Sequence, residues 1–452
     1  MKLLNNKLSG GIIIKKFIII VATLIGILVI LNIYLYKTGS VFEEKERLNA
    51  INETLSDSKN IYFAYYIDGT ITRGMPNKDS GYTLDKEKSN CSNGVTVGWN
   101  QDDWTVIVNY DNFNVTDNTR TKCNLYFKKN NITAVKKITE LANYDTTNLA
   151  RDEAGNIRYI GRNPNNYVIV DGEYWRIIGV MNNIDDGTGT KSDRIKLIRS
   201  ESIGNYSWNT CESTINSGKG LNEWSEADLM KLLNPGYEIE PVGGSLYWNN
   251  KIGTCYNGIK NATTSCDFTS TGLKPTLKGL IGAAVWNTGA NDGVTYLYNN
   301  IKTSKFYELE RSNNTGKICT SGINCNDTVT RTTSWKGLVG LMYSSDFGYS
   351  TSGDSAVDRA TCLNTEMYGW YNYSYYDCGF YSWLVLAINQ WLLTPYAESA
   401  ASNSAFYMHS QGRPYTQNTG VGNAVRPVVY LKSNVKILGG EGTSDNPFVL
   451  SD

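Results

Sequence analysis

The sequence predicts an N-terminal transmembrane helix, then a small all-β domain, and then a larger α+β domain with long loops held by disulfide bonds. Three observations lead to this expectation. An uncharged apolar run lies near the N-terminus, and all nine cysteines follow it. The remaining chain is rich in tyrosine and glycine, with 31 and 42 among 452 residues. Such a composition is typical of turn-rich β structure with surfaces suited to contact.

The apolar run covers residues 17–36, FIIIVATLIGILVILNIYLY, and contains no charged side chain. Twenty residues in a helix are long enough to cross about 30 Å of hydrocarbon. Four lysines precede the run, so we expect residues 1–16 to be a cytoplasmic tail and the bulk of the chain to be extracellular after a single pass. A cleaved signal peptide is the alternative, although its apolar core usually has only ~7–15 residues. Either way, the bulk lies outside the cytoplasm.

The cysteines indicate disulfide bonds, which form in such compartments. Their spacing suggests four local pairs, with Cys211 left over: Cys91 with Cys123, Cys255 with Cys266, Cys319 with Cys325, and Cys362 with Cys378. Spacing alone does not fix the connectivity. The chain has no C-x2-C pair and one histidine, so we expect no zinc site. The loop DDGTGTKSD, residues 185–193, could hold calcium through its carboxylates, but a solvated hairpin turn is the preferred interpretation. We assign no metal ligand and no cofactor.

Changes in pattern along the chain divide it into further segments. We expect a stalk helix at 37–59, a small β domain at 60–130, a linker with a short helix at 131–164, and one large domain at 165–452.

Local sequence signals mark several turns and one helix. Asp68-Gly69 and Asp171-Gly172 each stand between β-rich runs and predict tight hairpins. Residues 222–237 predict a helix capped at its start by Ser225.

Several segments of the large domain together resemble an uncharacterised surface domain of Gram-positive bacteria of the Firmicutes. They are DGEYWRIIGV, IKLIRSESIGNYSWN, NEWSEADLMKLLN, GLVGLMYSSDFGYS, WLLTPYA and VRPVVYLK. The resemblance covers roughly residues 165–435, and Thr394 stands where the family more often has Arg-Ser. The pattern is similar to the C-type-lectin-like fold shared with formylglycine-generating enzymes. That resemblance implies a looped antiparallel sheet with one or two flanking helices, but fold alone does not imply function.

Charge and motifs limit the classes of function. The formal net charge is zero, which argues against a nucleic-acid partner. The calcium-binding Glu-Pro-Asn, Gln-Pro-Asp and Trp-Asn-Asp motifs of sugar-binding C-type lectins do not occur. No nucleophile motif is present, and Asp346 and Glu366 are the acids considered for glycoside cleavage. We therefore expect a membrane-anchored ligand-binding (adhesion) protein without evident catalysis; the alternative is an extracytoplasmic enzyme acting on cell-wall or host glycans.

The aromatic run EMYGWYNYSYYDCGFYSW, residues 366–383, is the candidate contact surface for a glycan or protein ligand. Aromatic rings can stack on sugars or anchor a protein contact, although part of such a run is expected in the core. The proposed ligand-binding residues are Tyr368, Trp370, Tyr371, Tyr373 and Tyr375.

The segment NAVRPVVYLKS, residues 423–433, places Arg426 and Pro427 beside a strand-forming run. Proline is tolerated where a strand begins or lies at an edge, and the arginine can bind loop carbonyls or a carboxylate. We expect structural roles for both, and for Trp391 and Trp175 in the resembling segments.

Overall fold

We describe the fold from a computed structural model. It describes residues 61–77, 81–100, 103–112, 120–129, 132–210, 220–290, 298–313, 331–372, 374–396 and 403–452. The segments expected to be a cytoplasmic tail at 1–16, a transmembrane helix at 17–36 and a stalk helix at 37–59 all lie outside these residues. Among the residues within these ranges, no helix is long and apolar enough to cross a membrane.

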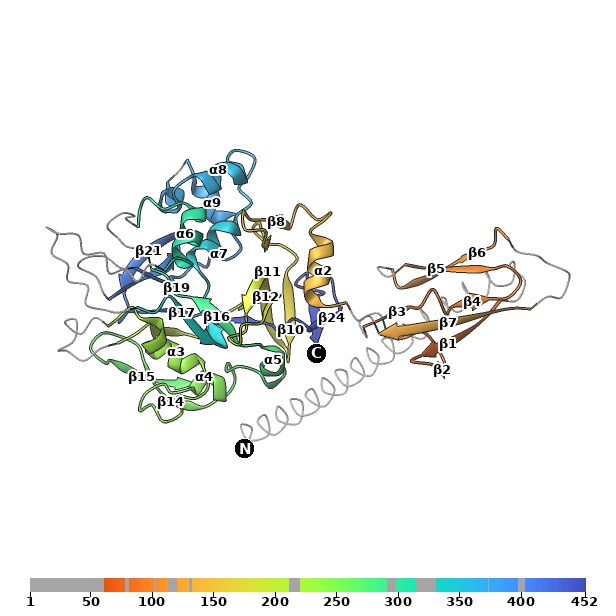
Figure 1. The fold of residues 1–452 in the computed structure, drawn as a ribbon, viewed down its shortest axis with the longest axis horizontal. Coiled ribbons are helices and arrows are strands. Elements are labelled where there is room, and N and C mark those ends of the chain that lie inside the picture. Colours follow the sequence, from red (N-terminus) through yellow and green to blue (C-terminus); the bar gives the residue numbers. More distant parts are fainter. Residues whose placement is uncertain are drawn as a thin grey trace, which may run out of the picture. The chain divides into compact units, whose positions relative to one another are not determined.

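The described residues fall into two compact units, and each is considered by itself. The first contains residues 61–77 and 82–129, and the second contains Gly81 and the residues from 132 onward. Both units are mainly β structure, and within the described residues the helices lie in the second unit (Figure 1).

The first unit is built around a twisted sheet in the order β2-β1-β7-β3, with β4 also paired to β7. Strands β1 and β7 run parallel, and a separate hairpin joins β5 to β6. Asp68 and Gly69 have φ angles of 49° and 81° and form the turn between β1 and β2, as the sequence predicted. The strands are β1 Ile61–Ile67, β2 Thr70–Thr72, β3 Tyr82–Leu84, β4 Asn90–Cys91, β5 Thr96–Asn100, β6 Thr105–Asn109 and β7 Thr121–Lys129.

The second unit holds a nine-stranded sheet with the main order β18-β23-β12-β11-β10-β25-β24, to which β9 and β8 are added. A five-stranded sheet has the order β13-β22-β19-β20-β21. Two more hairpins are β14–β15 and β16–β17. The strands are β8 Leu149–Arg151, β9 Ile157–Tyr159, β10 Tyr167–Val170, β11 Glu173–Asp185, β12 Lys191–Arg199, β13 Asn205–Ser207, β14 Ile252–Tyr256, β15 Thr263–Asp267, β16 Ala284–Asn287, β17 Ser334–Gly337, β18 Val339–Gly340, β19 Gln390–Tyr396, β20 Ser404–His409, β21 Arg413–Asn418, β22 Gly422–Ala424, β23 Val428–Tyr430, β24 Lys436–Gly439 and β25 Phe448–Ser451.

Short helices flank these sheets, and α6 to α9 gather together in Figure 1. The helices are α2 Ala134–Leu141, α3 Asp228–Leu233, α4 Leu246–Asn249, α5 Pro275–Leu280, α6 Thr303–Glu310, α7 Ser344–Tyr349, α8 Arg359–Asn364 and α9 Tyr376–Phe380, with 3-10 turns η2 Trp224–Glu226 and η3 Met367–Tyr371.

Two local expectations were wrong. Ser225 does not cap the predicted helix, because it lies inside η2 and α3 begins only at Asp228. The segment 131–164 contains the expected short helix, α2, but its described part is not a linker, because β9 pairs with β11 and β8 pairs with β9. Both strands have only three residues, and their burial comes from pairing with a distant strand rather than from their own sequence pattern.

Other local expectations hold. Asp171 and Gly172, with φ angles of 50° and 78°, form the turn between β10 and β11. Three of the four suggested cysteine pairs are disulfide bonds: Cys91–Cys123, Cys255–Cys266 and Cys362–Cys378. The pair Cys319 and Cys325, and Cys211, lie outside the described residues.

Candidate functional site

Two of the predicted tyrosines lie beside residues from distant parts of the chain. Tyr368 and Tyr371 belong to η3, and their rings lie next to Arg413 and Tyr415 of β21 and to Tyr298. We call these five residues the tyrosine–arginine surface. The ring of Tyr371 is the most open of them, with 40% of its surface exposed. The other four are half-buried.

The rings of this surface pack edge to face and in parallel. The Tyr298 ring centroid lies 5.0 Å from that of Tyr415 and 5.3 Å from that of Tyr368. The Tyr368 and Tyr415 rings stack at 5.8 Å, and Tyr371 lies 5.5 Å from Tyr368. These separations are those of favourable aromatic pairs, so the rings hold one another in place.

The guanidinium group of Arg413 lies among these rings. Its central carbon is 3.9 Å from the Tyr371 centroid, 4.5 Å from that of Tyr368 and 5.4 Å from that of Tyr415. Its Nε and Nη1 atoms are buried and donate to no acceptor in the described part of the chain. Cation–π contacts of this kind attract the guanidinium group to the rings, but they do not satisfy its N–H donors.

Two ionisable side chains, one in the tyrosine–arginine surface and one beside it, have shifted pKa values. A side-chain hydrogen bond with Tyr415, and then burial, raises the pKa of Tyr298 to about 12. Burial, and then the positive charge of Arg413, lowers the pKa of His409. His409, the single histidine of the chain, therefore stays uncharged at neutral pH, and Arg413 is the cation that the surface offers.

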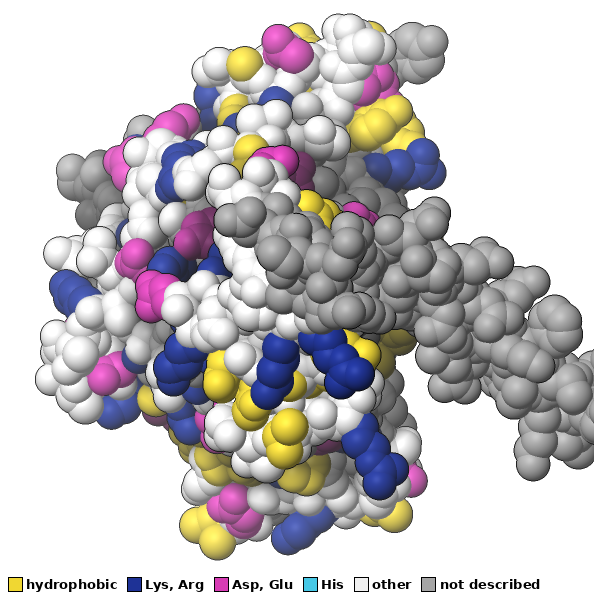
Figure 2. All heavy atoms as spheres, turned by 90° about the vertical axis from the view of Figure 1, so that its right-hand side faces the viewer, with side chains coloured by type: hydrophobic (Ala, Val, Ile, Leu, Met, Phe, Trp, Pro, Cys, Tyr) yellow, Lys and Arg dark blue, Asp and Glu magenta, His cyan; other side chains and the backbone are white. Residues whose placement is uncertain are grey.

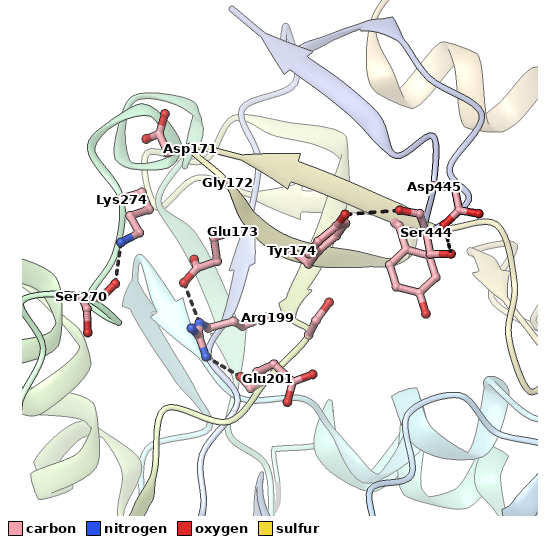
Figure 3. A pocket seen from close by; sticks show the side chains of 12 residues that line it. Asp171, Gly172, Glu173, Tyr174, Arg199, Glu201, Ser270, Lys274, Ser444 and Asp445 are labelled. Atoms are coloured by element: carbon pink, nitrogen blue, oxygen red, sulfur yellow. Dashed lines mark hydrogen bonds and ion pairs between the residues drawn. The ribbon is translucent and has the colours of Figure 1, made fainter. Parts of the chain in front are cut away.

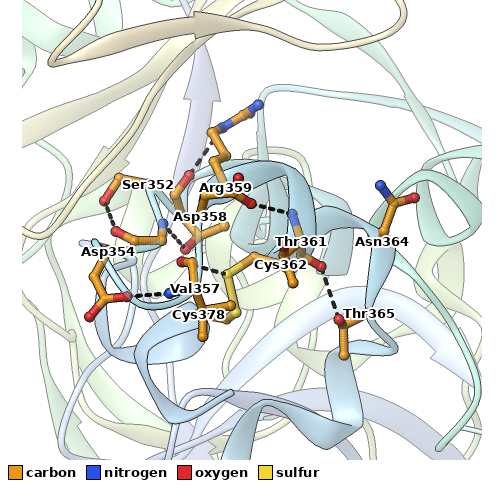
Figure 4. The surroundings of a disulfide bond; sticks show 12 residues. Ser352, Asp354, Val357, Asp358, Arg359, Thr361, Cys362, Asn364, Thr365 and Cys378 are labelled. Carbon is orange, nitrogen blue, oxygen red and sulfur yellow. Dashed lines mark hydrogen bonds between the residues drawn. A yellow bond between two sulfur atoms is a disulfide. The ribbon is translucent and has the colours of Figure 1, made fainter. Parts of the chain in front are cut away.

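A disulfide bond fixes the segment that carries η3. Cys362 of α8 and Cys378 of α9 are both fully buried and covalently joined, so the chain between them is closed into a loop (Figure 4). The Asp358 side chain caps α8 by accepting a hydrogen bond from the Thr361 amide at 2.7 Å. The tyrosines are thus presented on a loop with restrained ends.

The structure separates the predicted ligand-binding residues. Tyr368 and Tyr371 reach the tyrosine–arginine surface, whereas Trp370 is fully buried and packs on Phe347, so it is removed from the expected contact surface. Tyr375 is partly buried against the core, and Tyr373 lies outside the described residues. Tyr298, Arg413 and Tyr415 were missed, because nothing in their local sequence links them to residues 366–383.

The four residues expected to be structural lie in the interior. Pro427 directly precedes β23, which lies between β18 and β12. Arg426 is 3% exposed and donates from Nε to the Arg199 carbonyl at 2.8 Å and from Nη1 to the Leu384 carbonyl at 3.3 Å. The indoles of Trp391 and Trp175 are buried and donate to the Tyr206 carbonyl at 2.8 Å and to Glu173 Oε2 at 2.7 Å.

A buried charge network occupies the interior of the same unit. Asp346 accepts from Lys196 Nζ at 2.5 Å and from Arg158 Nη1 at 2.6 Å, and Arg158 Nε also binds Asp152 at 2.8 Å. Burial alone would raise the pKa of Asp346, but Lys196 and Arg158 outweigh it and lower the pKa to about 2. Burial lowers the pKa of Lys196 to about 8 against the opposing effect of Asp346, so Lys196 remains mostly protonated at neutral pH. Asp346, considered above for glycoside cleavage, is thus fully buried and committed to two cations.

Metal ligands give no further site in the part of the chain that the structure describes. The described residues contain no group of three or more His, Cys, Asp or Glu side chains placed to hold a metal ion. On the face shown in Figure 2, several basic side chains lie close together beside hydrophobic ones, and acidic side chains are scattered. Comparison of the chain with protein-family models, with curated proteins and with solved structures found no match in any of the three.

Proposed function

We propose that this chain is a membrane-anchored bacterial cell-surface protein whose large domain has a C-type-lectin-like fold and binds a glycan or protein ligand. The apolar run at 17–36 is the proposed anchor, with the N-terminus in the cytoplasm and the bulk outside. The disulfide bonds support an oxidising location outside the cytoplasm.

One observation carries the proposed binding role. Partly exposed tyrosine rings surround Arg413, whose buried N–H groups have no acceptor in the described part of the chain. Tyrosine and arginine are the residue types that dominate the energy of many contact surfaces, because both give a large contact area and directional hydrogen bonds. A ring that is already packed loses little conformational freedom when a ligand binds it. The surface is therefore prepared for contact before any ligand arrives.

The test uses the full chain in detergent micelles against arrays of host glycans, cell-wall glycans and surface proteins. We expect retention of at least one ligand and no cleavage of it. Matched Tyr368→Ala and Tyr371→Ala chains should lose that retention. Release of shortened glycans by the wild-type chain would instead favour an extracytoplasmic enzyme on the same scaffold.

A further inference from the structure

An open groove of about 620 Å³ lies at the turn between β10 and β11 (Figure 3). Asp171, Glu173 and Tyr174 line it from the hairpin, Arg199 and Glu201 from the end of β12, and two loops close the sides through Lys274 and Asp445. The groove shares no residue with the tyrosine–arginine surface. Its volume is within the range of small-molecule sites.

The polar side chains at the base of the groove already form hydrogen bonds and an ion pair with one another. Arg199 Nε donates to Glu173 Oε1 at 2.8 Å, and the Trp175 indole donates to Glu173 Oε2 at 2.7 Å. Arg199 Nη1 also donates to the Glu201 carbonyl at 2.8 Å. The side chains of the Arg199–Glu173 ion pair are 10% and 8% exposed. These opposite charges cancel, so the base offers a fixed polar surface without a net charge.

One wall offers an aromatic ring. Tyr174 is 42% exposed, and its ring meets the Tyr167 ring edge to face at 6.2 Å. Behind Tyr167 lies the Arg176 guanidinium, 4.1 Å from the Tyr167 ring centroid. The Tyr174 hydroxyl donates to the Ser444 carbonyl at 3.3 Å, so the ring is held from both ends while part of its surface stays open.

The rim of the groove offers both hydrogen-bond acceptors and hydrogen-bond donors. The Glu201 carboxylate is exposed and accepts no hydrogen bond from any residue that the structure describes. Lys274 Nζ uses one of its three N–H groups on the Ser270 carbonyl at 2.5 Å. Asp171 accepts from Thr276 at 2.7 Å, and Asp445 accepts from Ser444 at 3.2 Å, which leaves further lone pairs on both carboxylates.

We propose that this groove binds a short neutral oligosaccharide. Sugar hydroxyls both donate and accept, which matches a rim with free acceptors at Glu201 and Asp445 and free donors at Lys274. The C–H face of a sugar ring can lie on the open part of the Tyr174 ring. Of the charges left after the Glu173–Arg199 pair, three are negative and one is positive, so a carboxylated or sulfated sugar is disfavoured.

A peptide ligand fits this groove less well. An extended peptide usually adds to an unpaired strand edge. Here β10 is paired on both sides, to β11 and β25, and β11 is paired to β10 and β12. The groove therefore provides no backbone ladder for a peptide to extend.

The test measures binding of neutral tetrasaccharides derived from chitin, β-glucan and mannan to the full chain in detergent micelles. The variants are Tyr174→Ala and the near-isosteric Glu201→Gln, with Tyr144→Ala as a control because Tyr144 is 70% exposed and lies outside the groove. We expect at least one tetrasaccharide to bind, with affinity at least about tenfold weaker in Tyr174→Ala and unchanged in Tyr144→Ala. All three variants should remain fully folded at the temperature of the binding measurement.

The same measurements in a Tyr371→Ala chain distinguish the groove from the tyrosine–arginine surface. Binding that survives Tyr371→Ala and is lost with Tyr174→Ala belongs to the groove. The proposal is overturned if no neutral tetrasaccharide binds, or if binding persists in both groove variants. It is also overturned if these variants abolish only the binding of a uronic-acid oligosaccharide or a lysine-rich peptide.

Discussion

Lys196 Nζ and Asp346 Oδ2 lie 2.5 Å apart, and the two side chains are 0% and 1% exposed. They belong to β12 and α7 and are 150 residues apart in sequence. Three aromatic rings, those of Tyr343, Trp286 and Tyr430, surround the ammonium group at 4.1 to 5.5 Å. The contact therefore ties two elements of the large unit together in a region closed to bulk solvent.

Removal of one partner from this network should destabilise the fold strongly. In Asp346→Asn, Lys196 and Arg158 remain buried without a carboxylate between them, and we expect a loss of roughly 3–5 kcal/mol in the free energy of unfolding. Urea unfolding of the full chain measures this loss in the free energy of unfolding. Glu308→Gln is the control, because Glu308 lies 2.7 Å from Lys305 but is 68% exposed, and less than about 1 kcal/mol should be lost there. Equal losses in both variants would contradict the role of burial.

The same carboxylate predicts a dependence of stability on pH. The pKa of Asp346 is lowered from 3.8 to about 2 in the folded chain, so the unfolded chain takes up its proton first as the pH falls. The stabilisation is complete above about pH 4 and should be lost between about pH 4 and pH 2. Urea midpoints measured across this range should fall less steeply in Asp346→Asn than in wild type. Parallel slopes would exclude Asp346 as the titrating group.

Arg426 should act on stability rather than on ligand binding. Burial, and then the positive charge of Arg176, lowers the pKa of Arg426 to about 9, yet its guanidinium still donates to the Arg199 and Leu384 carbonyls. We expect Arg426→Met to lose roughly 2–4 kcal/mol in urea unfolding, because the Arg199 carbonyl loses this donor and the Leu384 carbonyl is left with the Gln390 amide. A fully stable variant that only fails to bind ligand would overturn this structural role.

Substitution of two adjacent residues of η3 should destabilise the fold to very different extents. Trp370 is fully buried, so Trp370→Ala should lose roughly 3–5 kcal/mol. Tyr371 is 40% exposed and contributes mainly a cation–π contact, so Tyr371→Ala should lose only about 1 kcal/mol. Thermal or urea unfolding of the two variants checks the contrast. A larger loss for Tyr371 would mean that its ring belongs to the core.

Local features were predictable where a few adjacent residues decide the outcome. Asp68-Gly69 and Asp171-Gly172 form hairpins because both residues of each pair adopt positive φ. Trp370 and Tyr371 could not be sorted in advance, because a short 3-10 turn has neither the strand nor the α-helix period of burial.

The candidate site was predictable only in part, because long-range contacts complete it. Tyr368 and Tyr371 stand out in an aromatic run, but Arg413 reaches them from β21, a strand distant from that run in the sequence. Likewise, nothing near Asp346 indicates that Arg158, 188 residues earlier, is its partner. Only the folded sheet brings such residues together.

The most direct measurement compares the affinity of the full chain for a retained surface ligand in wild type, Tyr371→Ala and Tyr376→Ala. Tyr371 and Tyr376 are similarly exposed, at 40% and 43%, but Tyr376 stacks on Phe380 and lies outside the tyrosine–arginine surface. We predict at least about tenfold weaker binding for Tyr371→Ala and unchanged binding for Tyr376→Ala, with all three proteins equally folded. Full affinity in Tyr371→Ala, or equal losses in both variants, would contradict ligand binding at this surface.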